Sequence, residues 1–160
     1  MKRKLLAVNH SILFLCVSMY LGTGWSLILF SFPIAPQLTV ENYYLQFVPQ
    51  VAAATKFFTY MTSLMIVLGV IMTIAEWKTG FRWVPLVVLA AVVAATGLTM
   101  IFIFPLNEAM SKGLTDPGQL KDVLSQWMFL NKIRVGLWTV QWFSLMVYFA
   151  RQFIRAESQP

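Results

Sequence analysis

Four long apolar segments constrain the fold of this 160-residue chain more than any other feature. They cover about 5–32, 51–75, 84–104 and 128–149, and each reaches the roughly 20 residues that cross about 30 Å of hydrocarbon. Because backbone inside a bilayer must satisfy its own hydrogen bonds, these segments are predicted to be helices. We therefore predict an all-α fold, a polytopic membrane four-helix bundle with four transmembrane helices. It forms a single domain over residues 1–160, with a frayed tail at 156–160.

The composition supports a membrane protein and excludes one class of partner. Hydrophobic residues make up 59% of the chain and charged residues only 11%, against about 25% charged in an average soluble domain. Such a chain cannot cover itself with a polar surface, so membrane lipids are its expected surroundings. The net charge of +6 comes from basic residues at the ends of apolar runs, which is a topology signal. We therefore exclude nucleic acid as a partner.

The distribution of lysine and arginine predicts the orientation of the chain. Both ends and the short loop between the second and third segments are basic, whereas the two longer loops mix acids with bases. The positive-inside rule then places both termini in the cytoplasm of a multi-pass protein, which we expect in a bacterial inner membrane. The basic start resembles a signal peptide, but its apolar run exceeds the ~7–15 residues of the hydrophobic region of a signal peptide, so it is predicted to remain as the first span.

Each of the two longer, outer loops is predicted to carry a short interfacial helix. In the first loop, Thr39 is expected to cap a segment over 40–48, and Pro49 suits the first turn of the second span. In the second loop, Asp116 followed by Pro117 is a strong helix-start signal. The apolar residues that follow recur at helical spacing, so this helix is expected to lead into the fourth span, with or without a break.

The main polar feature of the fourth segment is Arg134. Asn131 lies three residues earlier and shares its helix face, which Trp127 and Trp138 extend by one turn in each direction. An arginine at the bilayer centre costs roughly 2.5–3.5 kcal/mol and less near an interface. Arg134 therefore needs a partner, an aqueous cavity or a route for its side chain to the headgroups.

The nearest predicted partners of Arg134 are Asn107 and Glu108, just after Pro105, which is expected to end the third helix. In the functional interpretation, Arg134 and Asn107 are catalytic residues of an outward-facing pocket, and Glu108 and Asn131 bind substrate. In the structural interpretation, Arg134 reaches the headgroups or joins the third and fourth helices through Glu108. Asn107 would then only cap the turn that Pro105 begins.

Aromatic residues near the outer side supply predicted pocket walls. These are Trp127 and Trp138 of the fourth segment, Trp25 near the outer end of the first, and Tyr43 and Tyr44 in the first outer loop. The alternative for Trp25 is an anchor at the membrane interface, where tryptophan is common.

The metal-ligating residue types are too few to suggest a metal centre. The chain has one histidine, His10, and one cysteine, Cys16, and its nine methionines form no cluster. No cofactor and no metal site are therefore predicted. His10 is interpreted as a polar residue at the inner edge of the first helix, and Glu76 as one half of a solvated pair with Lys78 or Arg82.

The span layout, the Pro105-Leu106-Asn107 sequence, and Trp127, Asn131 and Arg134 together resemble the anthrone oxygenase-like family of small four-helix membrane proteins, a domain of unknown function. The resemblance extends over nearly the whole chain. It implies a cofactor-poor oxidoreductase that oxidises anthrones to anthraquinones, although most members of that family have no known activity. Likeness of this kind transfers fold more readily than reaction.

Two functional hypotheses follow. In the first, an integral membrane protein binds a small hydrophobic, quinone-like ring compound, and Asn107 and Arg134 stabilise an enolate-like anion of the substrate. In the second, the chain is a small accessory or structural subunit of a larger membrane complex, or part of a homo-oligomer. A transporter or channel is a third alternative, which the small number of buried charges disfavours.

Overall fold

The computed structural model describes residues 2–157, and this part of the chain is helical with no strand, as predicted. Five α-helices are joined by short connections. Two π-helical segments, η1 (Leu27–Ser31) and η3 (Thr99–Ile103), and one 3₁₀ turn, η2 (Ala35–Gln37), complete the helical elements. The α-helices are α1 (Lys2–Ser26), α2 (Tyr43–Glu76), α3 (Trp83–Leu98), α4 (Phe104–Ser111) and α5 (Pro117–Glu157).

Three helical stretches of the described chain are long and apolar enough to cross a membrane. They are Lys4–Ser31, Tyr43–Glu76 and Trp83–Ser111, and they contain the first three predicted spans almost entirely. Helix α5 is too polar to meet the same criterion, so its role as a fourth span stays a prediction. With 34 and 41 residues, α2 and α5 are about 51 and 62 Å long, so each extends well beyond about 30 Å of hydrocarbon.

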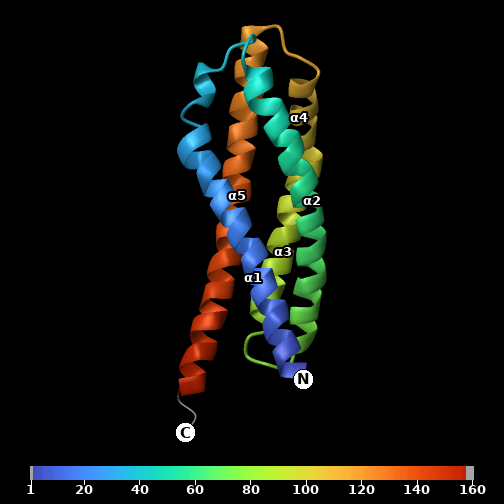
Figure 1. Cartoon of the computed structure of the whole chain (residues 1–160), viewed down its shortest axis with the longest axis vertical. Helices are drawn as coiled ribbons and strands as arrows, with labels where there is room; N and C mark the ends of the chain where they lie inside the picture. Colours follow the sequence, from blue (N-terminus) through green and yellow to red (C-terminus); the bar gives the residue numbers. More distant parts are fainter. Residues whose placement is uncertain (1, 158–160) are drawn as a thin grey trace.

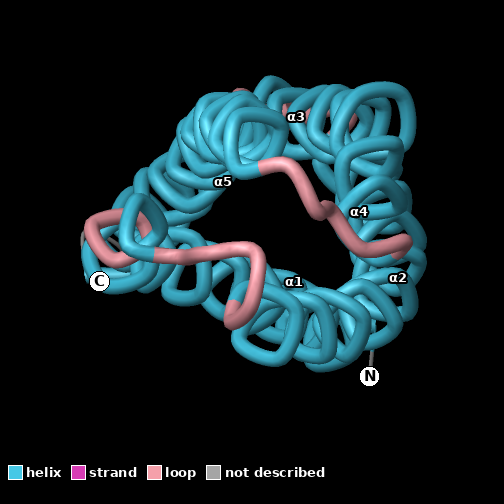
Figure 2. The backbone as a smooth tube through the Cα atoms, turned by 90° about the horizontal axis from the view of Figure 1, so that it is seen from above, coloured by secondary structure: helices cyan, strands magenta, loops and turns pink. Residues whose placement is uncertain are grey.

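The long helices pack side by side around a common axis. Helix α1 lies between α5 and α2, and α3 lies between α2 and α5, so each of the four contacts two neighbours. Figure 2 shows this cyclic order from above, and Figure 1 shows that the two ends of the chain lie at the same end of the bundle. The loop that joins α1 to α2 and the loop that joins α4 to α5 therefore lie together at the opposite, upper end.

The prediction that Pro105 ends the third helix is wrong. The chain continues from α3 through η3 into α4, with Pro105 in the first turn of α4. A proline has no N–H to donate and disturbs the hydrogen bonds of the preceding turn. Here the preceding turn is π-helical, and the Phe104 N–H bonds to the carbonyl of Thr99, five residues back. The wider turn accommodates the proline, so the helical path reaches Ser111.

The predicted interfacial helix over 40–48 is also not separate. Residues 43–48 form the first turns of α2, residues 40–42 form a turn before it, and Pro49 lies inside the helix. The Tyr43 side chain is buried at the start of α2, where its hydroxyl donates to the carbonyl of Met110, 3.1 Å away, and accepts from the N–H of Leu114. This contact joins the beginning of α2 to the α4–α5 connection, so the helix starts well before Pro49.

The helix start at Asp116 is confirmed. Its carboxylate accepts hydrogen bonds from the backbone N–H of Gln119 at 2.9 Å and of Gly118 at 3.4 Å, and Pro117 opens α5. The helix then continues without a break to Glu157, so the expected interfacial helix is the first part of α5. Residues 156 and 157 are helical rather than frayed, and the remainder of the predicted tail, 158–160, lies outside the described residues.

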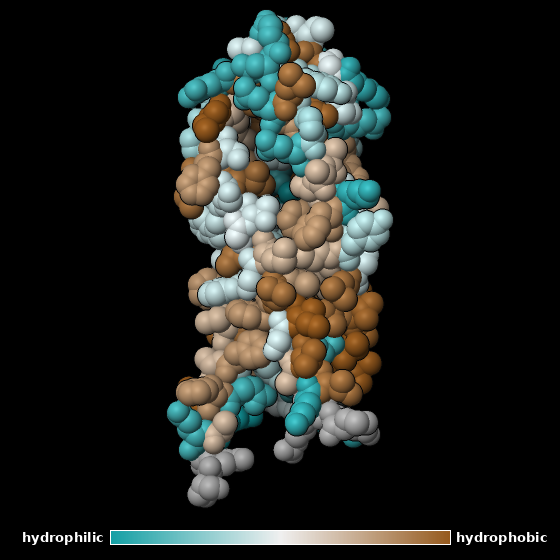
Figure 3. All heavy atoms as spheres, in the orientation of Figure 1, coloured by the Kyte–Doolittle hydropathy of each residue, from teal (hydrophilic) through white to brown (hydrophobic). Residues whose placement is uncertain are grey.

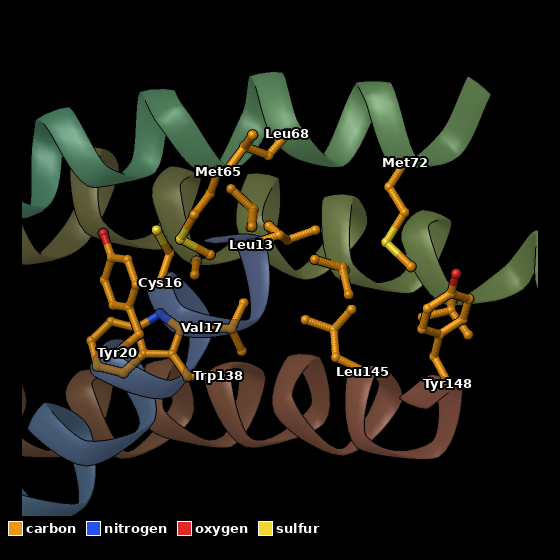
Figure 4. Packing of buried hydrophobic residues seen from close by; sticks show 14 of the residues in the cluster. Leu13, Cys16, Val17, Tyr20, Met65, Leu68, Met72, Trp138, Leu145 and Tyr148 are labelled. Atoms are coloured by element: carbon orange, nitrogen blue, oxygen red, sulfur yellow. The ribbon is translucent and has the colours of Figure 1, made fainter. Parts of the chain in front are cut away.

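The hydrophobic interior is divided into two clusters. The lower core, near the chain ends, holds side chains from α1, α2, α3 and α5, and Figure 4 shows several of them pointing toward one another between the helices. The upper core lies beneath the two outer loops. The lower core includes Leu13, Val17, Tyr20, Met65, Met72, Trp138 and Leu145, and the upper core includes Phe32, Tyr43, Ile103, Met110, Leu120 and Trp127.

Candidate functional site

A cavity of about 860 Å³ lies between the two cores. Its upper end is lined by Phe32 and Trp127 of the upper core. Its lower end is lined by Met65, Val92 and Trp138 of the lower core. A volume of this size is within the range of ligand sites in proteins. The division of the core thus leaves a space large enough for a small organic molecule.

The cavity opens sideways between α1 and α2. These helices are joined at the lower part of the cavity, where the Tyr20 hydroxyl donates to the carbonyl of Phe58 at 3.0 Å, and nearer the chain ends, where the Asn9 amide donates to that of Leu68 at 3.1 Å. Above this level, Leu27 of η1 and Gln50 of α2 line the cavity from its two sides. Figure 3 shows the surface hollowed in its upper half between the two helices.

The walls are mainly apolar, with polar groups confined to particular positions. Among the described residues that line the cavity, Arg134 is the only one with a charged side chain. Threonines are the commonest polar lining residues, and several bond back to the carbonyl four residues earlier in their own helix, as Thr59, Thr96 and Thr99 do. An apolar molecule with an electronegative group would therefore find one strong hydrogen-bond donor here.

The Arg134 side chain contacts η3, which continues from α3, and the ring of Trp138. Its guanidinium donates to the Thr99 hydroxyl at 3.3 Å and lies 4.7 Å from the ring centre of Trp138. Within residues 2–157, the buried Nε of Arg134 has no hydrogen-bond partner. Helix α5 therefore bonds to η3 through Arg134, and one buried donor of Arg134 is left unused. The neighbouring π-helical turn is a kind of distortion that is frequent at functional sites.

Glu108 does not pair with Arg134. Its carboxylate lies 2.7 Å from the Lys112 ammonium, and both side chains are largely exposed. The prediction that Glu108 joins the third and fourth helices is wrong, because α4 continues the helix and carries Glu108 onto the outer surface. It lines a second, shallower hollow beside Lys56 rather than the main cavity.

Asn107 and Trp127 meet at the upper end of the cavity. The indole N–H of Trp127 donates to the amide oxygen of Asn107 at 2.9 Å, and both residues line the cavity. The Trp127 ring is also held edge-to-face by Phe32 and Phe47, with ring centres 5.7 and 4.6 Å away. With its oxygen occupied, the Asn107 amide has its N–H groups available as donors.

The other predicted site residues lie outside the cavity lining. Asn131 is fully buried, and its amide donates to the Trp127 carbonyl at 2.8 Å. Trp25 is exposed and donates to the Thr139 hydroxyl at 3.2 Å. Tyr43 fastens α2 as described above, and Tyr44 is exposed beside it. The predicted aromatic walls thus reduce to Trp127 and Trp138, because the early start of α2 turns the two tyrosines away.

The lining residues missed from the sequence include two polar ones beside Arg134 and Trp138. Thr99 accepts the hydrogen bond of Arg134, and Gln141 is buried at the lower end of the cavity. Gln141 follows Arg134 by seven residues and Trp138 by three, so helical spacing alone would have placed it on the same face. Nothing in the local sequence indicates Thr99, because its pairing depends on how α3 and α5 are aligned.

A second polar cluster lies at the lower end of the bundle. The Tyr148 hydroxyl donates to the Glu76 carboxylate at 2.7 Å and lies 3.2 Å from Nδ1 of His10, and the Thr79 hydroxyl donates to the other Glu76 oxygen at 2.6 Å. All but Thr79 are buried. The prediction of a solvated Glu76 pair is wrong, since α1, α2 and α5 close over its side chain. His10 lies toward the lower end of α1, but it is buried there.

The described part of the chain has no group of three or more histidine, cysteine, aspartate or glutamate residues placed to hold a metal ion. Comparison of the chain with models of protein families, with curated proteins and with solved structures gave no match.

Proposed function

We propose that this chain is an integral membrane protein that binds a small hydrophobic ring compound in the cavity, with an oxygen of that compound bonded to Arg134. The supporting observation is the unused donor of Arg134 in a mainly apolar cavity, where no other charged side chain of the described residues lies in the lining. Burying a donor without a partner is costly, so a ligand with an acceptor oxygen is favoured there over a hydrocarbon.

In this proposal α5 is the fourth span of a transmembrane four-helix bundle. Its polar residues Asn131 and Gln141 are buried inside, whereas Phe129, Val140 and Phe143 are exposed apolar side chains on the opposite side. Polar groups in spanning helices face the interior or a cavity in this way. With both termini in the cytoplasm of a bacterial inner membrane, the cavity would open in the outer half of the bilayer.

The chemistry we propose is that of a cofactor-poor oxygenase resembling the anthrone oxygenase-like family. An anthrone-like ring would lose a proton to water and give an enolate-like anion with charge on oxygen, and dioxygen would then oxidise that anion to the anthraquinone with release of water. Arg134 would act as a fixed donor toward that oxygen, as preorganised donors do in other enzymes, and the amide N–H groups of Asn107 would be further donors at the upper end of the cavity. Trp127 supports this arrangement by holding Asn107 at 2.9 Å.

Binding can be tested in lipid nanodiscs by tryptophan quenching, with empty nanodiscs as the control for partition into lipid. Arg134→Leu should weaken binding of anthraquinone about 10–100-fold, since a hydrogen bond from a charged donor contributes about 1.5–3 kcal/mol. Lys132→Leu is the matched control, because Lys132 is an exposed cation two residues away on the same helix. Equal binding by Arg134→Leu and the unmodified protein would refute the role of Arg134.

A second proposal is a small accessory or structural subunit of a larger membrane complex, or a homo-oligomer. One observation favours it: Gly22, Gly97 and Gly136 each face open space, with nothing from other parts of the described chain within 4 Å of an added Cβ. Small residues on outer helix faces let another helix approach closely in lipid. Stoichiometric copurification with larger proteins in mild detergent would support this proposal, and a ligand-bound monomer would count against it.

A further inference from the structure

Gln141 is a buried amide with both of its polar ends unused. It is 1% exposed and lines the lower end of the cavity. Neither its amide nitrogen nor its amide oxygen has a hydrogen-bond partner within the described chain. A buried side chain amide without partners costs roughly 1–3 kcal/mol for each unsatisfied group, so its retention here needs a reason.

Gln141 and Arg134 lie on one face of α5, seven residues apart. At 1.5 Å per residue their Cα atoms are about 10 Å apart along the helix axis. Trp138 lies between them, 5% exposed and also lining the cavity. The polar wall of α5 therefore has two unsatisfied positions at the two ends of an aromatic surface, one a cationic donor and the other both donor and acceptor.

A ligand with a single polar group could satisfy only one of these positions. The cavity is lined along α5 from Trp127 to Gln141, about 21 Å of helix, so it has room for a ligand that reaches both. The Trp138 ring between the two positions already contacts the Arg134 guanidinium and the Tyr20 ring, with centres 4.7 Å away in each case, so it bounds the space for the ligand rather than stacking on it. The remaining walls, from α1, α2 and α3, are mainly apolar and would contact the body of such a molecule.

We infer that the ligand is a flat aromatic compound with hydrogen-bonding oxygens at two opposite ends, one bonded to Arg134 and the other to Gln141. This inference rests on the proposed ring-compound function and specifies its substrate class. Gln141 selects for the second oxygen, preferably a hydroxyl group, which can donate to the amide oxygen and accept from the amide nitrogen.

The test compares three probes that differ only in their hydroxyl groups. These are anthraquinone, its monohydroxy derivative, and anthraflavic acid, which carries a hydroxyl group on each outer ring. The unmodified protein in nanodiscs should bind anthraflavic acid about 5–10-fold more tightly than the monohydroxy compound, the effect of one neutral hydrogen bond of about 1–1.5 kcal/mol.

Gln141→Leu should abolish that preference and leave binding of the monohydroxy compound unchanged. Gln50→Leu is the matched control, because Gln50 lines the same cavity from an exposed position and should keep the preference. Gln141→Met, which preserves side-chain length, should behave as Gln141→Leu does, so a packing defect specific to leucine would be recognised.

The outcomes separate the two levels of the proposal. Binding of all three probes without a preference, or a preference that survives Gln141→Leu, would overturn the role of Gln141 and indicate that water occupies its position. Failure of the unmodified protein to bind any probe would overturn the proposed ring-compound function as well.

Discussion

Two buried polar regions of α5 differ in how their hydrogen bonds are completed. At the lower end, Tyr148 bonds to Glu76 of α2 and to His10 of α1, so three helices supply partners to one another. Since the tyrosine proton goes to Glu76, Nδ1 of His10 must be the donor to the Tyr148 oxygen. In the upper region, Arg134 and Gln141 retain unused groups beside a cavity.

On the proposed function, the difference separates polar groups that stabilise the fold from polar groups that bind a ligand. A completed network fixes the positions of the helices that share it, whereas an incomplete one lowers stability until something binds. One polar atom of the lower cluster also lacks a hydrogen bond, because Nε2 of His10 has no partner among residues 2–157. His10 does not line the cavity of about 860 Å³, however, whereas Gln141 does.

The variant expected to have the largest effect is Tyr148→Phe, which tests whether the lower cluster stabilises the fold. The variant removes the hydroxyl group that satisfies Glu76 and His10, and leaves both buried. We expect the free energy of unfolding to fall by about 1–3 kcal/mol, measured by reversible unfolding in mixed micelles. Gln141→Leu should instead leave stability unchanged or raise it, since it removes groups that have no partner. If Gln141→Leu lowered the free energy of unfolding more than Tyr148→Phe, the region around Gln141 would be the structural one instead.

A second comparison uses two glycines of α1. An added Cβ at Gly24 would lie 2.7 Å from the side chains of both Trp138 and Val135, whereas one at Gly22 meets nothing within 4 Å. Gly24→Ala should therefore push α1 away from the cavity floor and cost about 1–3 kcal/mol. Gly22→Ala should be neutral or stabilising by up to about 1 kcal/mol. Thermal unfolding in detergent would detect the contrast, and similar shifts for both variants would contradict it.

A substitution at the upper end of the cavity should lower the free energy of unfolding less. Trp127→Phe removes the 2.9 Å hydrogen bond to Asn107 but keeps a ring between Phe32 and Phe47. The expected loss in unfolding free energy is about 1 kcal/mol, the usual contribution of one neutral hydrogen bond. The same micelle titration measures it. A loss as large as that of Tyr148→Phe would mean that Asn107 belongs to a structural network like the lower one.

The smallest effect is expected on the outer surface. Lys112→Gln breaks the exposed 2.7 Å ion pair with Glu108. Exposed pairs contribute little because water and salt screen them, so the change should stay below about 0.5 kcal/mol and should not alter ligand binding. A clear loss of anthraquinone binding would instead connect the outer hollow to the main cavity.

Local signals in the sequence predicted local structure well. The apolar segments gave three membrane-length helices, and Asp116-Pro117 gave the start of α5, because length, hydropathy and capping depend on neighbouring residues. The prolines misled for a related reason. A proline usually ends a helix, but Pro105 follows a π-helical turn that lets the chain continue, and the residue pattern around it does not reveal that turn.

The sequence by itself therefore determined that this is an all-helical chain with membrane-length apolar helices and a polar face on α5 around Arg134. Only the tertiary structure decided which groups complete one another. Thr99 bonds to Arg134 from 35 residues away, Tyr148 bonds to Glu76 from 72 residues away, and Gln141 has no partner among the described residues. The physical reason is that each pairing depends on the relative height and rotation of the packed helices. These are set by all the contacts between the helices together, and no local sequence pattern reveals them.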